Sequence, residues 1–354
     1  VESCGMLSSL VNRISHWKRG PEETVQLLRD QLAAAEEADA GSARTRAVES
    51  VSRTVLALKG ILYGDGENPP QEEDANTLAR LASEDDLLML LASHLDCMGF
   101  EARKEGVQIF NNLLKRELEN GVTVLEKAGE TFAPEILQQL MRWYNSNETA
   151  LNAGAMLREC FRNERFVTAM ISLPEFWKFF DLVEVSDFDV ASDSYTTFKA
   201  LLTRHQAPIA AFLEDNYDQF FTHYNALLKS SNYVARRQSL KLLGEMLSER
   251  ANFKIMIKYI ASADNLKLMM NLLLDRAKHI KYEAFHVFKI FVANPNKPQA
   301  VHNILFKNRE KMLSYLDSFL TDRDDEQFHE DRQRIADLIR DLKPYEEQQT
   351  PAQS

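Results

Sequence analysis

Tyr233, Arg237 and Lys241 are the residues whose types and spacing most clearly suggest binding chemistry. They stand at positions i, i+4 and i+8, so a single helix would project them from one face. Soft methionine side chains form adaptable pockets, and cations around such pockets favour a carboxylate. The chain supplies both residue types shortly afterwards, as Met256, Lys258, Lys267, Met269 and Met270. The pattern predicts a pocket for an aromatic, acidic peptide.

The same residue types also have an ordinary structural explanation. Methionine at helical spacing is often core filler, and lysine or arginine on a helix often forms a solvated face. Spacing alone therefore leaves both interpretations open.

These residues lie in a basic part of an acidic chain. The 354 residues carry a net charge of −11, yet the stretch from Lys229 to Glu310 holds 15 Lys and Arg against 6 Asp and Glu. The acidic total argues against general nucleic-acid binding, whereas the basic stretch suits an acidic ligand.

Catalytic and metal-binding patterns are missing from the sequence. It contains no Gly-x-Gly-x-x-Gly, no Gly-Lys-Ser/Thr phosphate loop and no Gly-x-Ser-x-Gly. The eight histidines lack metal-ligand spacing, and His205, His223 and His286 lie in helical contexts that favour structural roles. We expect no enzyme activity, no catalytic residues and no cofactor.

The acidic stretch from Asp322 to Glu326 resembles the start of an EF-hand calcium loop. Such a loop needs Gly at its sixth position and Glu at its twelfth, where this chain has Gln327 and Gln333. We expect a solvated loop before the last helix and no metal site.

A repeated unit indicates which elements position these side chains. Two apolar, two mostly polar and two or more apolar residues recur with spacings of 52, 47, 41, 45 and 45 residues, around Leu58, Phe110, Leu157, Phe198, Leu243 and Phe288. Armadillo and HEAT units have periods of about 40 to 47 residues. Apolar residues also recur at i, i+3, i+4 and i+7, without alternating strand patterns. The sequence predicts an all-α fold, an armadillo/HEAT-like right-handed α-solenoid of about six to seven helical repeats.

Each repeated unit sits late in a helix that begins with polar or basic residues, and in armadillo-like stacks such a helix lines the concave face. We expect residues 17–343 to form a single helical-repeat domain. Residues 1–16 are expected to be an extension outside it, and residues 344–354 a disordered tail. Turn-forming residues at 64–70, 132–134, 206–208 and 294–298 separate helices.

Cysteine usage and hydropathy bear on location. Cys4, Cys97 and Cys160 form no Cys-x-x-Cys pair and are too few for a disulfide framework. No window approaches the roughly 18 uninterrupted apolar residues of a membrane span. We expect a reducing, cytoplasmic location and no membrane insertion.

Long runs of the sequence closely resemble the Mo25 family, also called calcium-binding protein 39, whose fungal members are the hymA or Hym conidiophore-development proteins. These runs are Asn232 to Val234, Arg237 to Glu245, Asn265 to Leu273, Glu283 to Lys289 and Phe291 to Lys297. Shorter matches are Gln108 to Asn112, Met156 to Cys160 and Phe198 to His205. The resemblance covers roughly residues 17–343.

The resemblance implies a non-catalytic scaffold that binds protein kinases of the Ste20 or germinal-centre type, or a STRAD-like pseudokinase, and holds the kinase domain active. It implies a monomer within a heteromeric complex. In fungi the setting would be an NDR-kinase pathway of polarity and morphogenesis, with recruitment to the cell cortex or septation sites.

The resemblance also implies roles for individual residues. Met270 would line a pocket for a C-terminal Trp-Glu-Phe peptide, and the residues around the peptide and its carboxylate would be Tyr233, Arg237, Lys241, Lys267 and Lys307. Phe188, Arg250 and Phe253 match positions of a concave face that grips the kinase fold. Leu274 departs from the family, since animal members have a basic residue there, and this departure implies a shifted peptide preference. The name calcium-binding is not carried over as an activity.

The alternative function is an armadillo-type transport adaptor that reads basic localisation peptides. Such a groove is acidic and lined by Trp and Asn. The stretch around Arg237 is basic and holds none of the chain's tryptophans, which are Trp17, Trp143 and Trp177.

Overall fold

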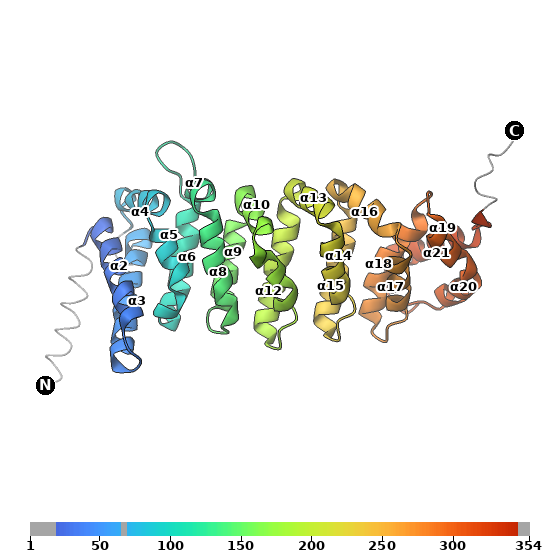
Figure 1. Cartoon of the computed structure of the whole chain (residues 1–354), viewed down its shortest axis with the longest axis horizontal. Coiled ribbons are helices and arrows are strands. Elements are labelled where there is room, and N and C mark those ends of the chain that lie inside the picture. Colours follow the sequence, from blue (N-terminus) through green and yellow to red (C-terminus); the bar gives the residue numbers. More distant parts are fainter. Residues whose placement is uncertain (1–18, 65–68, 346–354) are drawn as a thin grey trace. The chain divides into compact units, whose positions relative to one another are not determined.

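The computed structural model describes residues 19–64 and 69–345 (Figure 1). In these two ranges the regular structure is helical, apart from one isolated bridge between Glu117 and Thr123. The predicted all-α class is therefore confirmed. The chain forms two compact units, with the boundary between Pro208 and Ile209. Each unit is described by itself.

The first unit contains eleven α-helices among the residues that the structure describes, and short 3-10 turns at Leu95–Cys97, Trp143–Asn145 and Pro174–Lys178. Its helices are α2 (Pro21–Glu37), α3 (Ser42–Tyr63), α4 (Glu72–Glu84), α5 (Leu87–Ser93), α6 (Phe100–Lys115), α7 (Val124–Thr131), α8 (Ala133–Arg142), α9 (Ala150–Cys160), α10 (Glu164–Ser172), α11 (Phe179–Leu182) and α12 (Phe188–Arg204).

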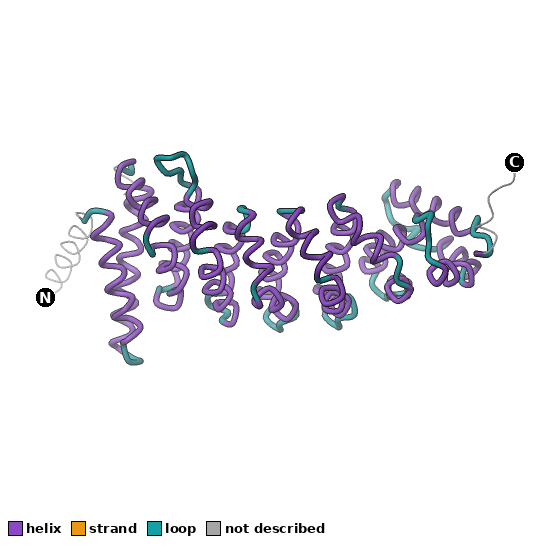
Figure 2. The backbone as a smooth tube through the Cα atoms, turned by 45° about the horizontal axis from the view of Figure 1, so that its top comes forward, coloured by secondary structure: helices purple, strands orange, loops and turns teal. Residues whose placement is uncertain are grey.

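The boundary between the units falls within α13 (Gln206–Asp215). The second unit continues with a 3-10 turn at Arg250–Asn252 and the helices α14 (Tyr217–Leu227), α15 (Tyr233–Ser248), α16 (Phe253–Ile260), α17 (Ala263–Leu273), α18 (Lys278–Ala293), α19 (Gln299–Lys307), α20 (Arg309–Asp317) and α21 (Glu326–Arg340). Most of the loops that the structure describes are short, and residues 116–123 and 318–325 form longer connections (Figure 2).

The repeated sequence unit falls on every third helix. Its six reference residues are buried and lie in α3, α6, α9, α12, α15 and α18. In the first unit α3 packs on α6, α6 on α9 and α9 on α12. In the second unit α15 packs on α18 and α18 on α21. A three-helix period with stacked third helices is the armadillo arrangement, and α21 is a further third helix that the sequence unit does not mark.

Ion pairs bridge neighbouring third helices of the first unit. They join Lys59 to Glu105 at 2.7 Å, Lys115 to Glu159 at 3.7 Å and Arg158 to Asp193 at 2.9 Å. Pairs with partly exposed partners add little stability, about 0 to 1 kcal/mol each. These pairs neutralise much of the charge on the polar faces of α3, α6, α9 and α12.

A buried polar cluster joins α9 to α12. The Tyr144 hydroxyl lies 3.0 Å from Asp193 Oδ2 and 2.9 Å from Thr197 Oγ1. Burial raises the pKa of Asp193, and the nearby Arg158 guanidinium opposes that rise. Gly154 makes the close approach possible, because a Cβ there would stand 1.8 Å from Asp193 Oδ2.

Two further predictions concern the ends of the chain and the membrane. Residues 1–16 and residues 346–354 of the predicted tail lie outside the described residues. Tyr345, which is described, packs against His302 with ring centroids 5.3 Å apart. That residues 17–343 form one domain stays a prediction. Among the residues described, no helix combines the length and apolar character needed to cross a bilayer.

Candidate partner-binding site

Helix α15 carries Tyr233, Arg237 and Lys241. Its first turn is capped by Asn232, whose side-chain oxygen accepts hydrogen bonds from Val234 N at 3.0 Å and Ala235 N at 3.2 Å. One side of the helix is buried, and Tyr233, Arg237 and Lys241 project from another. Tyr233 is 38% exposed, Lys241 is exposed and Arg237 is half-buried.

Glu283 on α18 is the charge that Arg237 and Lys241 face. Burial raises the pKa of this half-buried carboxyl, and Lys241, Arg237 and Arg323 each act to lower it, while Glu245 acts to raise it. Arg323 is itself paired with Asp325 at 3.2 Å, so the charges of this group balance. An acidic ligand of Arg237 and Lys241 would therefore compete with Glu283.

The methionines of α16 and α17 differ in burial. Met269 is fully buried and belongs to the core, whereas its neighbour Met270 and the earlier Met256 are half-buried. For Met269 the core-filler interpretation is therefore correct. Lys267 is exposed and pairs with Asp264 of the same helix at 2.9 Å, and Leu274, directly after the helix, is 66% exposed.

Lys307 is the exposed last residue of α19, and α19 packs on α17. The six residues predicted to bind a peptide thus belong to one unit and fall into two groups. Tyr233, Arg237 and Lys241 lie on α15, while Lys267, Met270 and Lys307 lie on α17 and α19. Helix α18 packs on both α15 and α17. That all six converge on one ligand stays a prediction.

The residues predicted to grip a kinase fold are exposed but belong to different units. Phe188 begins α12 in the first unit and is 67% exposed. In the second unit the Arg250–Asn252 turn leads into α16, whose first residue Phe253 is 60% exposed. The turn is held by Asn252, whose buried amide donates to the Met246 carbonyl at 3.0 Å. A large exposed aromatic ring held by a packed turn is available for contact with a partner.

The acidic stretch before α21 has structural partners. Asp325 caps α21 by accepting a hydrogen bond from Phe328 N at 3.0 Å, and the Tyr282 hydroxyl donates to its carboxylate at 3.1 Å. Asp322 pairs with Lys278. Across the described ranges no group of three or more His, Cys, Asp or Glu side chains is placed to hold a metal ion.

The three histidines expected to be structural have local partners. A His205 ring nitrogen lies 3.1 Å from the Phe161 carbonyl, and a His223 ring nitrogen lies 2.9 Å from the Gln219 carbonyl one turn earlier. His286 packs edge-on against Tyr282 with ring centroids 4.4 Å apart, and burial lowers its pKa.

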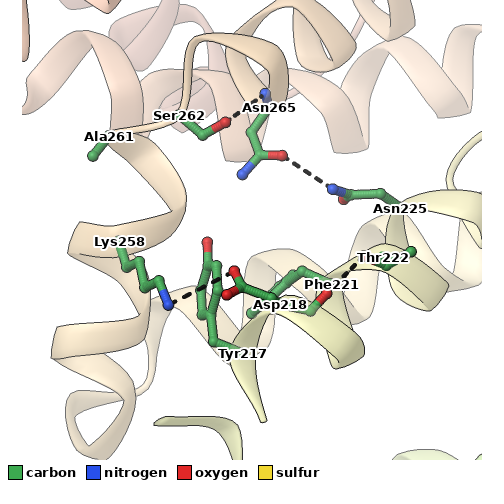
Figure 3. Close-up of a pocket in the computed structure, with 9 residues that line it drawn as sticks. All are labelled: Tyr217, Asp218, Phe221, Thr222, Asn225, Lys258, Ala261, Ser262 and Asn265. Atoms are coloured by element: carbon green, nitrogen blue, oxygen red, sulfur yellow. Dashed lines mark hydrogen bonds and ion pairs between the residues drawn. The ribbon is translucent and has the colours of Figure 1, made fainter. Parts of the chain in front are cut away.

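A cavity that no sequence pattern predicted lies in the second unit, lined by α14 and by the junction of α16 and α17 (Figure 3). Tyr217, Phe221 and Asn225 contribute to it from α14, at the same i, i+4 and i+8 spacing as the residues on α15. That spacing is the only sign of the cavity in the sequence pattern of α14. The other wall comes from Lys258, Ser262 and Asn265, and only the packing of α14 against the next helices reveals that pairing.

The chain is similar in sequence to known proteins over most of its length. The Mo25-like family profile matches residues 13–343. The chain is 45% identical over 326 residues to human calcium-binding protein 39-like, covering 92% of this chain and 96% of that protein. It is 42% identical over 300 residues to a Mo25-like protein of Schizosaccharomyces pombe, covering 84% and 91%. It is 33% identical to the conidiophore development protein hymA of Emericella nidulans, covering 89% and 88%. The chain therefore belongs to the Mo25 family, a membership that supports a scaffold-type protein.

Proposed function

We propose that this protein is a non-catalytic scaffold that binds and activates a protein kinase of the Ste20 or germinal-centre type, or a STRAD-like pseudokinase. It would act in the cytoplasm as one member of a heteromeric complex, with recruitment to the cell cortex or septation sites in a fungal NDR-kinase pathway. The observation that carries the proposal is the row of Tyr233, Arg237 and Lys241 on α15, in a chain of the Mo25 family.

The first part of the proposal is a site for a partner's C-terminal Trp-Glu-Phe peptide. Half-buried Met270 supplies a soft apolar surface for an aromatic ring. Lys267 and Lys307 are exposed cations on the same and the adjoining helix, suited to the peptide's glutamate and terminal carboxylate. The exposed Leu274 adds apolar surface where a further cation would have favoured acidic residues.

The second part is contact with the kinase fold through Phe188, Arg250 and Phe253. Binding would shift the kinase between inactive and active arrangements by favouring the active one. A difference in affinity of about 3 kcal/mol between the two arrangements changes their ratio by over 100-fold. The scaffold would therefore act stoichiometrically, without any phosphoryl chemistry of its own.

The peptide site is tested by titrating a labelled peptide that ends in Trp-Glu-Phe. We expect saturable binding that Met270→Glu abolishes and that C-terminal amidation of the peptide weakens. Ile257→Glu is the matched control, because Ile257 is also a partly exposed apolar residue of the second unit but is outside the proposed site. Absence of binding to the wild type, or equal binding by Met270→Glu, would refute the peptide site. Saturable binding of a lysine-rich peptide would instead favour the transport-adaptor alternative.

The role of the α15 cations is tested through their neighbour. Glu283→Gln removes a carboxylate that partly neutralises Arg237 and Lys241, so an acidic partner should bind the variant more tightly. Arg237→Ala should weaken the same binding. If both variants bind the Trp-Glu-Phe peptide like the wild type, α15 is not part of the peptide site.

Kinase activation itself is measured with an inactive Ste20-type kinase domain and increasing amounts of the scaffold. Activity should rise until the two proteins are equimolar and then level off. Full activation by a few per cent of the scaffold would contradict a stoichiometric mechanism.

A further inference from the structure

The cavity between α14 and the α16–α17 junction is separate from every residue used in the proposed function. Its volume is about 430 Å³, within the range of about 300 to 1,000 Å³ that small ligand sites occupy. All its lining residues belong to the second unit, and those used below are Tyr217, Phe221, Asn225, Lys258, Ser262 and Asn265 (Figure 3).

One wall of the cavity is a pair of side-chain amides. Asn225 Nδ2 donates to Asn265 Oδ1 at 3.0 Å, and Asn265 Nδ2 donates to the Tyr259 carbonyl at 3.0 Å. The Tyr259 hydroxyl donates to Asn225 Oδ1 at 3.2 Å, which fixes the orientation of that amide. Each amide nitrogen carries two hydrogens, and the Asn265 side chain also hydrogen-bonds the Tyr217 hydroxyl. Asn225 keeps one N–H and one oxygen lone pair that these bonds do not use, and its fixed amide matches the acceptor and donor of a peptide group.

The floor of the cavity is aromatic. The Tyr217 and Phe221 ring centroids are 4.6 Å apart, and Phe221 in turn packs on Tyr259 at 5.0 Å. Burial raises the pKa of Tyr217, so its hydroxyl stays neutral. This floor suits an apolar side chain or the flat face of a peptide bond.

Lys258 stands at the rim as a cation with weakly held partners. Its ammonium lies 3.9 Å from the centroid of the Tyr217 ring and 3.8 Å from Asp218 Oδ1. The Asp218 side chain is almost fully exposed, and such surface pairs contribute about 0 to 1 kcal/mol. A carboxylate on a ligand could therefore replace Asp218 beside Lys258 at little cost. Lys254, one turn earlier on α16, pairs with Glu214 at 3.0 Å and does not line the cavity.

We propose that this cavity binds an extended peptide segment that carries an aspartate or glutamate side chain. The Asn225 amide, held in place by Asn265, binds a peptide group of the segment. Tyr217 and Phe221 receive the adjoining apolar side chain, and Lys258 pairs with the acid. The site does not depend on the proposed kinase function, and its ligand needs no free C-terminus.

The test uses the capped peptide acetyl-Leu-Asp-Ala-amide and its counterpart acetyl-Leu-Asn-Ala-amide, added to the full chain labelled with ¹⁵N-asparagine. We expect saturable shifts of the Asn225 and Asn265 side-chain amide signals with the aspartate peptide, at a Kd of about 1 mM or tighter for a ligand of this size. Lys258→Met and the change from aspartate to asparagine in the peptide should each weaken binding by up to about fivefold. Lys254→Met is the matched control and should bind like the wild type.

Two further variants keep the test decisive. Asp218→Asn removes the competing carboxylate and should tighten binding, whereas Ala261→Trp fills the cavity from an exposed position and should abolish it. Thermal melting followed by circular dichroism shows whether each variant is folded. The proposal is overturned if the wild type does not bind, or if Ala261→Trp binds as well as the wild type. It is also overturned if succinate binds as tightly as the peptide, since the cavity would then be a site for free carboxylates.

Discussion

Replacing Gly154 with alanine tests the buried cluster between α9 and α12. An added Cβ would stand 1.8 Å from Asp193 Oδ2 and 2.5 Å from the Tyr144 hydroxyl, closer than side-chain carbons approach other atoms. The Asp193 carboxylate must therefore shift, and this disturbs its ion pair with Arg158 at 2.9 Å. Gly154→Ala should destabilise the first unit although alanine favours a helix more than glycine does.

The magnitude follows from two opposing contributions. Displacing the Asp193 carboxylate weakens this ion pair and the hydrogen bond from the Tyr144 hydroxyl, at a cost of about 1 to 3 kcal/mol, because buried polar groups are left partly unsatisfied. The higher helix propensity of alanine returns about 1 kcal/mol. The free energy of unfolding of the first unit should fall by up to about 2 kcal/mol. Gly60→Ala in α3 is the matched control, since a Cβ there meets no atom within 4 Å, and it should be neutral or stabilising.

The assay is urea unfolding followed by tryptophan fluorescence. Trp143 and Trp177 both lie in the first unit, so the signal reports on the unit that carries the change. In an Asp193→Ala background the added methyl group meets no carboxylate, and the cost of Gly154→Ala should shrink. A Gly154→Ala protein as stable as the Gly60→Ala control would refute the reasoning.

Three other predictions follow from the same structure. His302 is fully buried and burial lowers its pKa, so the folded state favours the neutral ring and stability should be lost as the pH falls below about 6.5. Urea midpoints at pH 7 and pH 5 should differ less for His302→Gln than for the wild type, and equal differences would contradict this prediction. Asn232→Ala removes the cap of α15 and should cost about 1 kcal/mol of unfolding free energy in urea titrations, while a loss below about 0.3 kcal/mol would show that the cap does not hold the helix. Burial raises the pKa of Cys97 to about 11, so iodoacetamide at pH 8 should alkylate this thiol about 100-fold more slowly than an unperturbed thiol, measured in a Cys4→Ser background. Rapid alkylation would show that the Cys97 side chain is accessible and ionised.

Apolar periodicity determined the helices and much of their order. Because a helix buries the residues that recur at i, i+3, i+4 and i+7, the repeated unit marks a buried stripe wherever it occurs, and its period marks every third helix. The same local rule placed Tyr233, Arg237 and Lys241 on one face of α15. Turn-forming residues also predicted helix boundaries, since α18 ends at Ala293 and α19 begins at Gln299, on either side of the Pro295 to Pro298 stretch.

Contacts between helices were decided only by the tertiary structure. Met269 and Met270 are neighbours of the same type, yet one is core and the other is half-exposed, because their burial depends on how α17 is rotated against its neighbours. Glu283 meets Arg237 and Lys241 from another helix, and Lys258 reaches Tyr217 across the cavity. Helical periodicity fixes which residues share a face of one helix, but the side chain that a face meets depends on the stacking of whole repeats. The sequence thus determined the fold class and one face of the candidate site, and the stacking decided what surrounds it.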